Sequence, residues 1–511
     1  MTTAVKKEET KKNKTKTSSS PAKKEAVKTS KASSKKPKNS MKILMASAEV
    51  APFSKVGGLA DVVGELPPFL AEEGLEVAVF TPLYGCINQE KWGIKELPNS
   101  ELRISMGHTE HIFKLKMAKH PKSDKINIFF VDNPKYFSCF DVVYPIWVDE
   151  MYEQQRYVSF SLAVLEYAKL LNFKPDVIHA NDWHTAMLPV YIKTNYKYDD
   201  FYKNTKTVFT IHNLAYQGAC DKAIIDFANM RWDNVWYDNC IEHYGKVNWV
   251  KGAIYCSDMI TTVSPRYANE ILGSEMGEGM DYTLRGQTHK IRGILNGTYY
   301  DKKDFNLKEK PKFKEEVQKL FGLPINPKRP LISMISRLVY QKGLDLIDFA
   351  KFDLMNLPAD FVFLGTGEGG YQNMLIWASN NSSNIRAWID FKADLSETIY
   401  KGSDMFLMPS LFEPCGISQM VAMKYGTVPI VRATGGLDDT VISYPNEKAN
   451  GFKFLGYDAK SMVDEIKNGI WTYYDRKDDF KQLKENALKS KFTWTASAKE
   501  YMGVYKEITG K

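Results

Sequence analysis

The sequence lacks several features that would assign it to a common class. No apolar run approaches the roughly 18 residues of a membrane-spanning helix, so we expect no membrane partner. It also lacks the G-x-x-x-x-G-K-[ST] phosphate loop and any acidic cluster with metal-ligand spacing, which disfavours kinases and metal-dependent transferases. We therefore predict neither a metal nor a cofactor.

The sequence also contains no C-x-x-C pair. Its six cysteines are scattered, which argues against a disulfide framework and against a zinc site, and favours a reducing cytoplasm. They are Cys86, Cys139, Cys220, Cys240, Cys256 and Cys415.

Large apolar residues are almost missing from residues 1–40, which we interpret as a disordered tail. With no apolar core and with Lys in place of Arg, the tail resembles neither a secretory signal nor a transit peptide, and we expect a cytoplasmic protein. The whole chain carries a formal charge of +8, but the tail holds 13 Lys and 3 Glu and thus +10, which leaves −2 for the rest. We therefore expect no nucleic acid to bind the folded body.

The remaining chain is long enough for two hydrophobic cores, since the sequence has 511 residues and is 44% apolar. Short apolar segments such as "PDVIHA", "KTVFTI", "PLISMIS" and "TVPIVRA" alternate with helical stretches in both halves. This pattern predicts an α/β protein with two doubly wound, parallel-sheet domains, at residues 41–292 and 329–490. A polar, Lys-rich linker at 293–328 separates them.

Polar residues follow many of these predicted strands. Asp182, His212, Arg337, Lys342 and Glu413 all lie just beyond the carboxyl end of an apolar segment, where parallel sheets bind ligands. A single histidine or lysine there is more often structural or solvated. Because such residues recur in both halves, we predict one cleft that both domains face.

The stretch "KVGGLADV" places Lys55 beside a glycine turn at the start of a helix. Free amides and a cation suit a phosphate group, although an ordinary strand-to-helix turn is as compatible with this stretch alone. Across the cleft, Arg337 and Lys342 in "SRLVYQKG" and the "TGG" before another helix could hold the same diphosphate. This pattern predicts a nucleoside diphosphate leaving group.

Together, "KVGGLADVVGELP", "NDWHTAMLPVY", "TIHNLAYQG", "SRLVYQKGLDL" and "PSLFEPCGISQMVAMKYGTVPIVRATGGLDDTV" resemble the bacterial glycogen synthase and plastid starch synthase family from Met41 onward. The resemblance implies a GT-B fold, with two Rossmann-like domains and a C-terminal helix at 491–511 that returns to the first domain. It also implies metal-free transfer of glucose, with retention, from ADP-glucose, or UDP-glucose, to the non-reducing end of an α-1,4-glucan.

The resemblance assigns roles residue by residue. Arg337 and Lys342 stabilise the departing diphosphate, Glu413 holds the glucosyl unit, Asp182 lies near its 6-hydroxyl, and His212 lies beside the reacting carbon. The donor-binding residues that it implies are Lys55, Gly57, Gly58, Asn296, Phe391, Cys415, Gly416, Thr434, Gly435 and Gly436.

The chain departs from the family pattern in two places. Thr298 and Tyr299 follow "LNG" where a hydrophobic residue and Asp are usual. Asp390 replaces a glycine, and Phe391 replaces a tyrosine that stacks on the base. Phe391 keeps the stacking surface without the hydroxyl.

Three other hypotheses fit parts of the sequence. They are a different GT-B enzyme such as a sucrose or trehalose-phosphate synthase, a non-enzymatic glucan-binding scaffold, and a nucleic-acid-binding protein acting through its tail. "KVGGLADV" argues against the first, and Lys342 with Glu413 against the second.

Overall fold

The computed structural model describes residues 40–237, 240–301, 303–390 and 392–511. The predicted tail at 1–40 thus lies outside the described residues except for Ser40. None of the helices in these ranges is long and apolar enough to cross a membrane.

The first sheet is parallel over most of its width, and its central strands are short and buried except for the first residues of β1 and β8, as continuously apolar segments predict. A feature that the sequence analysis did not predict is an antiparallel extension of β3, β4 and β5 beyond β6. The strand order is β13 (Ile291–Gly293), β12 (Met259–Thr262), β8 (Lys206–Ile211), β7 (Val177–Asn181), β1 (Lys42–Ala46), β2 (Glu76–Pro82), β6 (Ser123–Asp132), β5 (Thr109–His120) and β3 (Lys95–Glu96), with β4 (Leu102–Met106) on β5.

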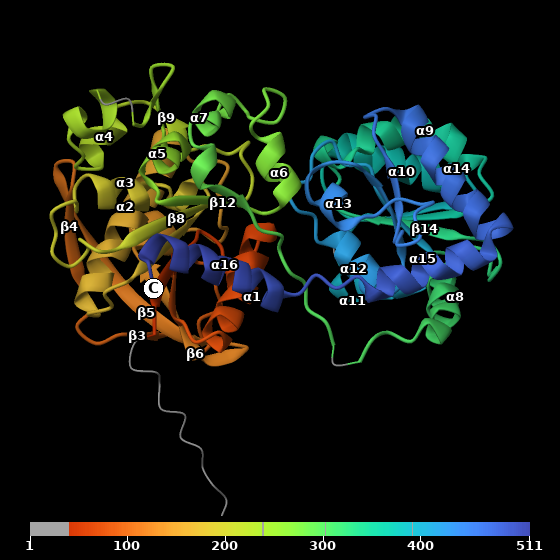
Figure 1. Ribbon diagram of the computed structural model, residues 1–511, viewed down its shortest axis with the longest axis horizontal. Coiled ribbons are helices and arrows are strands. Elements are labelled where there is room, and N and C mark those ends of the chain that lie inside the picture. The colour runs from red at the N-terminus through yellow and green to blue at the C-terminus, as the bar shows by residue number, and fades with distance from the viewer. Residues whose placement is uncertain (1–39, 238–239, 302, 391) are drawn as a thin grey trace, which may run out of the picture. The chain divides into compact units, whose positions relative to one another are not determined.

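Helices cover both faces of this sheet (Figure 1), and a small sheet of β10 (Glu242–His243), β11 (Lys246–Asn248) and β9 (Ala219–Cys220) lies beside it. The helices are α1 (Gly58–Glu72), α2 (Glu150–Leu170), α3 (Met187–Lys193), α4 (Ile224–Phe227), α5 (Trp249–Cys256), α6 (Pro265–Glu270), α7 (Asp281–Arg285) and α16 (Trp494–Thr509).

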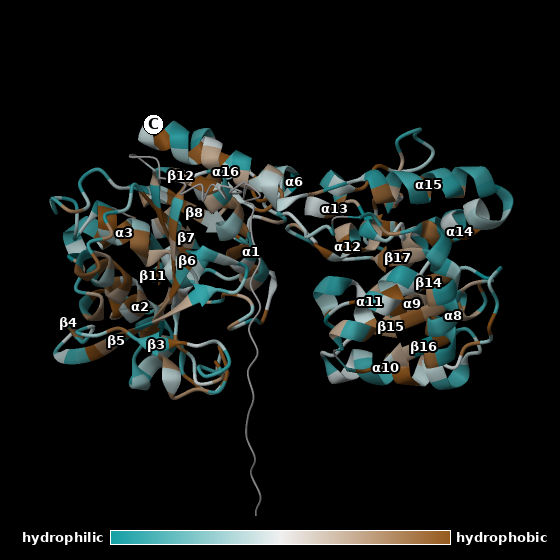
Figure 2. Ribbon diagram, turned by 90° about the horizontal axis from the view of Figure 1, so that it is seen from below, coloured by the Kyte–Doolittle hydropathy of each residue, from teal (hydrophilic) through white to brown (hydrophobic). Residues whose placement is uncertain are grey.

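The second sheet is parallel throughout and has its own core. Its order is β16 (Ile385–Trp388), β15 (Asp360–Leu364), β14 (Leu331–Ile335), β17 (Met405–Met408), β18 (Val428–Arg432) and β19 (Phe452–Phe454). Its helices are α8 (Lys310–Leu320), α9 (Leu344–Met355), α10 (Gly369–Asn381), α11 (Ala393–Gly402), α12 (Ser418–Lys424), α13 (Gly435–Thr440), α14 (Ala459–Asp475) and α15 (Lys477–Lys489). Figure 2 shows apolar residues concentrated on the inner strands of both sheets.

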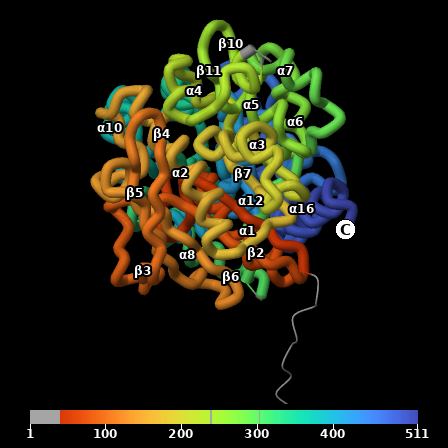
Figure 3. The backbone as a smooth tube through the Cα atoms, turned by 90° about the vertical axis from the view of Figure 1, so that its left-hand side faces the viewer, coloured from red at the N-terminus to blue at the C-terminus, as the bar shows by residue number. Residues whose placement is uncertain are grey.

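The last helix, α16, packs against α1 and belongs to the first core (Figure 3). Its Tyr505 hydroxyl lies 2.7 Å from His179 Nδ1, and His179 Nε2 lies 2.6 Å from the hydroxyl of Thr210. Burial lowers the pKa of His179 to about 3, so the ring is neutral at physiological pH. The C-terminal helix is therefore fixed to the strands β7 and β8 of the first sheet.

The chain passes between the two sheets twice, and the two passages lie side by side. The Thr298 N–H donates to the Phe492 carbonyl over 2.8 Å, and Thr298 and Thr493 form a parallel bridge. Gly297 allows this approach, because a Cβ atom there would lie 2.4 Å from the backbone nitrogen of Trp494. The segments that precede and follow the second sheet in the chain thus meet at one point.

Candidate active site

A cavity of about 770 Å³ is lined by segments that follow the carboxyl ends of strands from both sheets. The first sheet contributes the segments after β1, β7 and β8, and the second contributes those after β14 and β17. Parallel strands place all their carboxyl ends at one edge, so residues far apart in the sequence converge there. Among the predicted site residues, the cavity brings together Gly57, Gly58, Asp182, His212, Asn296, Arg337, Lys342, Glu413, Cys415 and Gly416.

The glycine loop before α1 is held by a carboxylate. Glu49 Oε2 accepts the N–H groups of Val56, at 2.6 Å, and Gly57, at 2.9 Å, and Glu49 Oε1 accepts the Tyr144 hydroxyl at 2.7 Å. Of the two glycine amides that the resemblance assigned to the donor phosphates, that of Gly57 is therefore donated to Glu49.

Lys55 does not line the cavity. Its ammonium group pairs with Asp61 Oδ1 at 2.7 Å, and half of its side chain (51%) is exposed to solvent. A pair this exposed contributes little stability, so the lysine can exchange partners at small cost.

Asp182 directly follows β7 and has a positive φ of 56°, which is costly for a non-glycine residue. This conformation turns its carboxylate toward β8, where Oδ1 accepts the His212 N–H at 2.7 Å. Burial raises the pKa of Asp182 to about 7, although the His212 and Asn213 N–H groups oppose that rise. Near neutral pH the carboxyl group can therefore donate a hydrogen bond as well as accept one.

His212 is a neutral imidazole with a defined tautomer. Its Nε2 lies 3.0 Å from Asn181 Oδ1, while Asn181 Nδ2 donates to the carbonyls of Ala46 and His179. The Asn181 oxygen is thus an acceptor, so His212 Nε2 carries the proton. Burial lowers the pKa of His212 to about 3, which keeps the ring uncharged.

The opposite wall holds a buried ion pair. Lys342 Nζ lies 2.5 Å from Glu413 Oε2, which also accepts the Ser410 hydroxyl at 3.1 Å. Only 17% of the Lys342 side chain and 10% of the Glu413 side chain are exposed. Arg337 also lines the cavity, and within the described residues no side-chain hydrogen bond or ion pair holds its guanidinium group.

Asn296 and Cys415 form the wall between the two sheets. The Asn296 Oδ1 atom is buried without a hydrogen-bond partner among the described residues, so it is an acceptor that a ligand could satisfy. Burial raises the pKa of the Cys415 thiol to about 12, which keeps it protonated and unreactive.

The structure does not bring the "TGG" segment to the cavity lining. The Gly435 N–H donates to the Glu270 carboxylate at 3.1 and 3.0 Å, and the Gly436 N–H donates to the Glu413 carbonyl at 3.1 Å. Thr434 is buried, and its hydroxyl faces Glu270 at 3.5 Å. A protein carboxylate thus occupies the helix start where the sequence predicted a phosphate. Phe391 lies outside the described residues.

Sequence reasoning missed Glu49, Tyr144 and Ser410. Glu49 lies three residues after β1, so its position at a strand end was a usable signal. Tyr144 lies in an irregular segment more than ninety residues away in the chain, and no local pattern connects it to Glu49. Ser410 follows β17, but serine is common after strands, so no sequence signal distinguished it.

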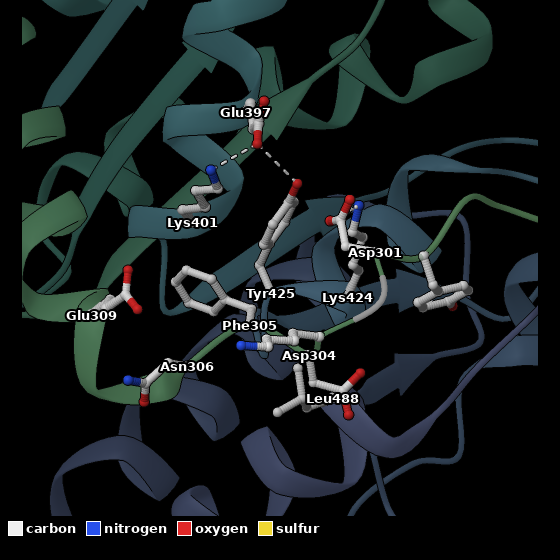
Figure 4. Close-up of a pocket in the computed structure, with 12 residues that line it drawn as sticks. Asp301, Asp304, Phe305, Asn306, Glu309, Glu397, Lys401, Lys424, Tyr425 and Leu488 are labelled. Atoms are coloured by element: carbon white, nitrogen blue, oxygen red, sulfur yellow. Dashed lines mark hydrogen bonds and ion pairs between the residues drawn. The ribbon is translucent and has the colours of Figure 1, made fainter. Parts of the chain in front are cut away.

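A second cavity, of about 360 Å³, lies on the second sheet's side and contains none of the predicted site residues (Figure 4). Its charged groups largely neutralise one another, since Lys401 pairs with Glu397 at 2.7 Å and Lys424 with Asp301 at 2.9 Å. The Tyr425 hydroxyl also donates to Glu397 at 3.2 Å. These groups are satisfied without a ligand, so this cavity is not a candidate active site.

Comparison with known proteins yields matches over nearly the whole described chain. Residues 42–286 match the starch synthase catalytic domain, and residues 316–489 match the group 1 glycosyl transferases. The glycogen synthase of Thermosipho melanesiensis is 41% identical over 92% of this chain and all of the relative. That of Clostridioides difficile is 42% identical over the same shares.

Among solved structures, the catalytic domain of starch synthase IV from Arabidopsis thaliana, bound to ADP and acarbose, matches with a TM-score of 0.82. It is 29% identical, and the match covers 93% of this chain and 100% of that domain. A sucrose-phosphate synthase from Thermosynechococcus elongatus has a TM-score of 0.57 at 17% identity, covering 92% and 99% of the two chains, which shows a shared fold alone.

Two parallel-sheet units with a cavity at the carboxyl ends of their strands, together with these matches, define a glycosyltransferase of the GT-B class. Within that class, the 41% and 42% identity to two glycogen synthases, over 92% of this chain, identifies the family. The chain belongs to the glycogen synthase and starch synthase family.

Proposed function

We propose that this protein transfers glucose from ADP-glucose to the non-reducing end of an α-1,4-glucan with retention of configuration. The observation that carries the proposal is the pair of basic residues, Arg337 and Lys342, beside Glu413 and opposite Asp182 and His212 in one cavity. Membership of the glycogen synthase family and the ADP-bound relative support this donor and this acceptor.

Arg337 and Lys342 act on the leaving group. The negative charge on the diphosphate grows as the glycosidic bond breaks, so cations fixed in the cavity stabilise the transition state more than the bound donor. Lys342 is already positioned by Glu413, and among the described residues the Arg337 side chain has no hydrogen bond or ion pair that it would have to give up. These two cations supply the positive charge that a divalent metal would otherwise provide.

Glu413, Asp182 and His212 recognise the glucosyl unit. Glu413 and the unpaired Asn296 oxygen accept hydrogen bonds from sugar hydroxyls, and a neutral Asp182 can donate one to the 6-hydroxyl. The uncharged His212 ring lies beside the reacting carbon without adding a charge near the developing oxocarbenium ion.

The chain's two units then have distinct roles. Residues 41–292 hold the acceptor and bring Lys55, freed from Asp61, to the donor phosphates, residues 329–490 bind the nucleotide sugar, and residues 293–328 link them. The C-terminal segment, 491–511, belongs with the acceptor unit, which agrees with the packing of α16 on α1. A cytoplasmic location suits both a nucleotide-sugar donor and a glucan acceptor.

Donor choice is tested by competition. ADP-glucose and UDP-glucose are supplied at equal, low concentration with glycogen as acceptor, and the product ratio gives the ratio of their kcat/KM values. We expect ADP-glucose to be preferred, because Phe391 offers a stacking surface on which a purine buries more area than uracil. A preference for UDP-glucose, or an unchanged ratio in Phe391→Ala, would refute the assignment of the base pocket.

A further inference from the structure

Cys240 and Cys256 form a pair of thiols on the first unit, outside the cavity. Their sulfur atoms are 3.3 Å apart, although the two residues are sixteen positions apart in the chain. A disulfide has about 2.05 Å between its sulfur atoms, so the gap that remains is roughly 1.25 Å. Neither cysteine lines the cavity. We call Cys240 and Cys256 the thiol pair.

The packing of the chain against α5 holds the thiol pair together. Cys256 is the last residue of α5, and Gly252 lies four residues before it, on the same face of the helix. Ile241, next to Cys240, packs on Gly252, where a Cβ atom would lie 2.7 Å from Ile241 Cγ2. Asn248, which caps the start of α5, donates its N–H to the Ile241 carbonyl at 2.7 Å. The backbone on both sides of the pair is therefore fixed.

The two thiols differ in exposure and in their surroundings. Cys256 is buried, with 9% of it exposed, whereas Cys240 is partly exposed. The bond from Cys240, and then burial, raise the pKa of Cys256 well above its usual value, so its thiol stays protonated. Burial lowers the pKa of Lys251, while Glu242 and Cys240 oppose that change, so the Lys251 ammonium group attracts the Cys240 sulfur. A nearby cation favours a thiolate, which makes Cys240 the nucleophile of the pair.

From this geometry we propose that the thiol pair is a reversible redox modification site, which a low-molecular-weight disulfide converts into a Cys240–Cys256 disulfide. The Cys240 thiolate attacks one sulfur of the small disulfide, so a mixed disulfide forms and one small thiolate leaves. Cys256 gives its proton to that thiolate, and its sulfur then attacks the Cys240 sulfur and releases the second small thiol. The two protein thiols lose two electrons and two protons in total, and the small disulfide gains both.

The new bond ties α5 to the small sheet of β9, β10 and β11. Cys240 precedes β10 by two residues, β10 pairs with β11, and β11 pairs with β9. A covalent link across sixteen positions removes freedom from the unfolded chain and therefore stabilises the fold. Because neither cysteine lines the cavity, the bond leaves the site residues in place. The thiol pair thus protects the first unit in an oxidising environment, and a reducing one restores both thiols.

The test treats the reduced full chain with oxidised glutathione and maps its disulfides by mass spectrometry of peptides, without reductant. We expect one linked pair of peptides, which contain Cys240 and Cys256. The temperature of thermal unfolding should rise by about 2–5 °C and should return to its starting value after dithiothreitol is added. Neither measurement uses a donor or an acceptor, so both are independent of the proposed function.

Cys240→Ser should show neither the linked peptides nor a rise in unfolding temperature between its own reduced and oxidised samples. Cys86→Ser/Cys139→Ser is the matched control, because it removes the two exposed thiols, keeps the thiol pair and should respond as the wild type does. The absence of linked peptides in the wild type overturns the inference, and so does a mixed disulfide that stays on Cys240. A rise that is lost in Cys86→Ser/Cys139→Ser but kept in Cys240→Ser overturns it as well.

Discussion

Lys342 and Glu413 neutralise each other across 2.5 Å in a wall that excludes most solvent. We predict that Lys342→Ala lowers kcat about 10²- to 10³-fold with a much smaller effect on donor KM, because the diphosphate charge peaks in the transition state. Initial rates over a range of ADP-glucose concentrations measure both constants. Lys460→Ala, which removes an 86% exposed lysine, is the control and should match the wild type. An effect on KM alone would refute the role of Lys342.

Asp182 gives a prediction for stability as a function of pH. Its pKa is about 7 in the folded protein against 3.8 ordinarily, so between these values the folded state binds the extra proton. The Asp182 carboxyl group therefore makes the wild type lose stability as pH rises from about 4 to about 7. Relative to the wild type, Asp182→Asn should gain about 1.4 kcal/mol of unfolding free energy per pH unit in that window.

Urea unfolding at several pH values measures this difference, and the histidines that both proteins share cancel from it. Asp258→Asn is a control of opposite sign. Burial alone would raise the pKa of Asp258, but Lys193 and the Thr207 N–H lower it overall, so the wild type gains stability with rising pH there. A flat difference for Asp182→Asn would mean that its carboxyl group ionises normally.

At the scale of single residues, strand-end position was enough to predict Asp182, His212, Arg337, Lys342 and Glu413 as members of one cavity. Strand-end position gave the wrong partner for the Gly435 N–H, which was expected to bind a phosphate. The N–H donates instead to Glu270, which lies on α6 of the other unit, 165 residues earlier in the chain. A glycine beside a helix start shows where an anion can bind. Whether that anion is a ligand or a side chain depends on a tertiary contact.

At the scale of elements, Gly297 allows the start of α16 to pass close to the backbone of the segment that links the two units. We predict that Gly297→Ala lowers the unfolding free energy by about 1–3 kcal/mol, because the new methyl group would overlap the Trp494 backbone. Thermal unfolding compares it with Gly503→Ala inside α16, where a Cβ atom meets nothing within 4 Å. That control should instead gain about 0.5–1 kcal/mol from helix propensity. Equal effects of the two substitutions would contradict the close approach at Gly297.

The quoted apolar segments predicted β7, β8, β14 and β18, because buried parallel strands need continuous apolar sequence. The antiparallel extension was not predicted. In β5, "TEHIFKLKMAKH" has buried and exposed residues in alternation over most of its length, which is typical of a half-exposed strand. The sequence alone does not identify the partner of such a strand.

At the scale of the whole molecule, polar contacts join the two units at α6. The Glu270 carboxylate accepts the Gly435 N–H, and the Arg266 N–H donates to Asp439 at 2.8 Å. We predict that Glu270→Ala broadens the distance distribution from small-angle X-ray scattering, since it leaves this amide without its anion. Arg103→Ala, which removes half-exposed ion pairs with Glu101 and Glu110, is the control and should not change the distribution. An unaltered curve for Glu270→Ala would show that other contacts fix the two units.

Catalysis should not depend on divalent ions. Because Arg337 and Lys342 provide the cationic charge at the cavity, we predict that EDTA leaves the initial rate of glucosyl transfer within about twofold of the untreated enzyme. As a control, excess Mg²⁺ is added after EDTA, so that an effect of the chelator itself can be told from an effect of metal removal. Loss of activity that Mg²⁺ restores would contradict the proposed use of side-chain cations.

The adjacency of Thr298 and Thr493 has a consequence for how this chain can be rebuilt. The second unit enters and leaves the first through neighbouring points, so it is topologically an insertion into a protein that begins at β1 and ends with α16. An insertion with adjacent ends can be excised or exchanged as one module, because joining the cut ends requires only a short loop. Donor specificity could thus be transplanted between relatives by exchanging residues 299–492 as a single cassette.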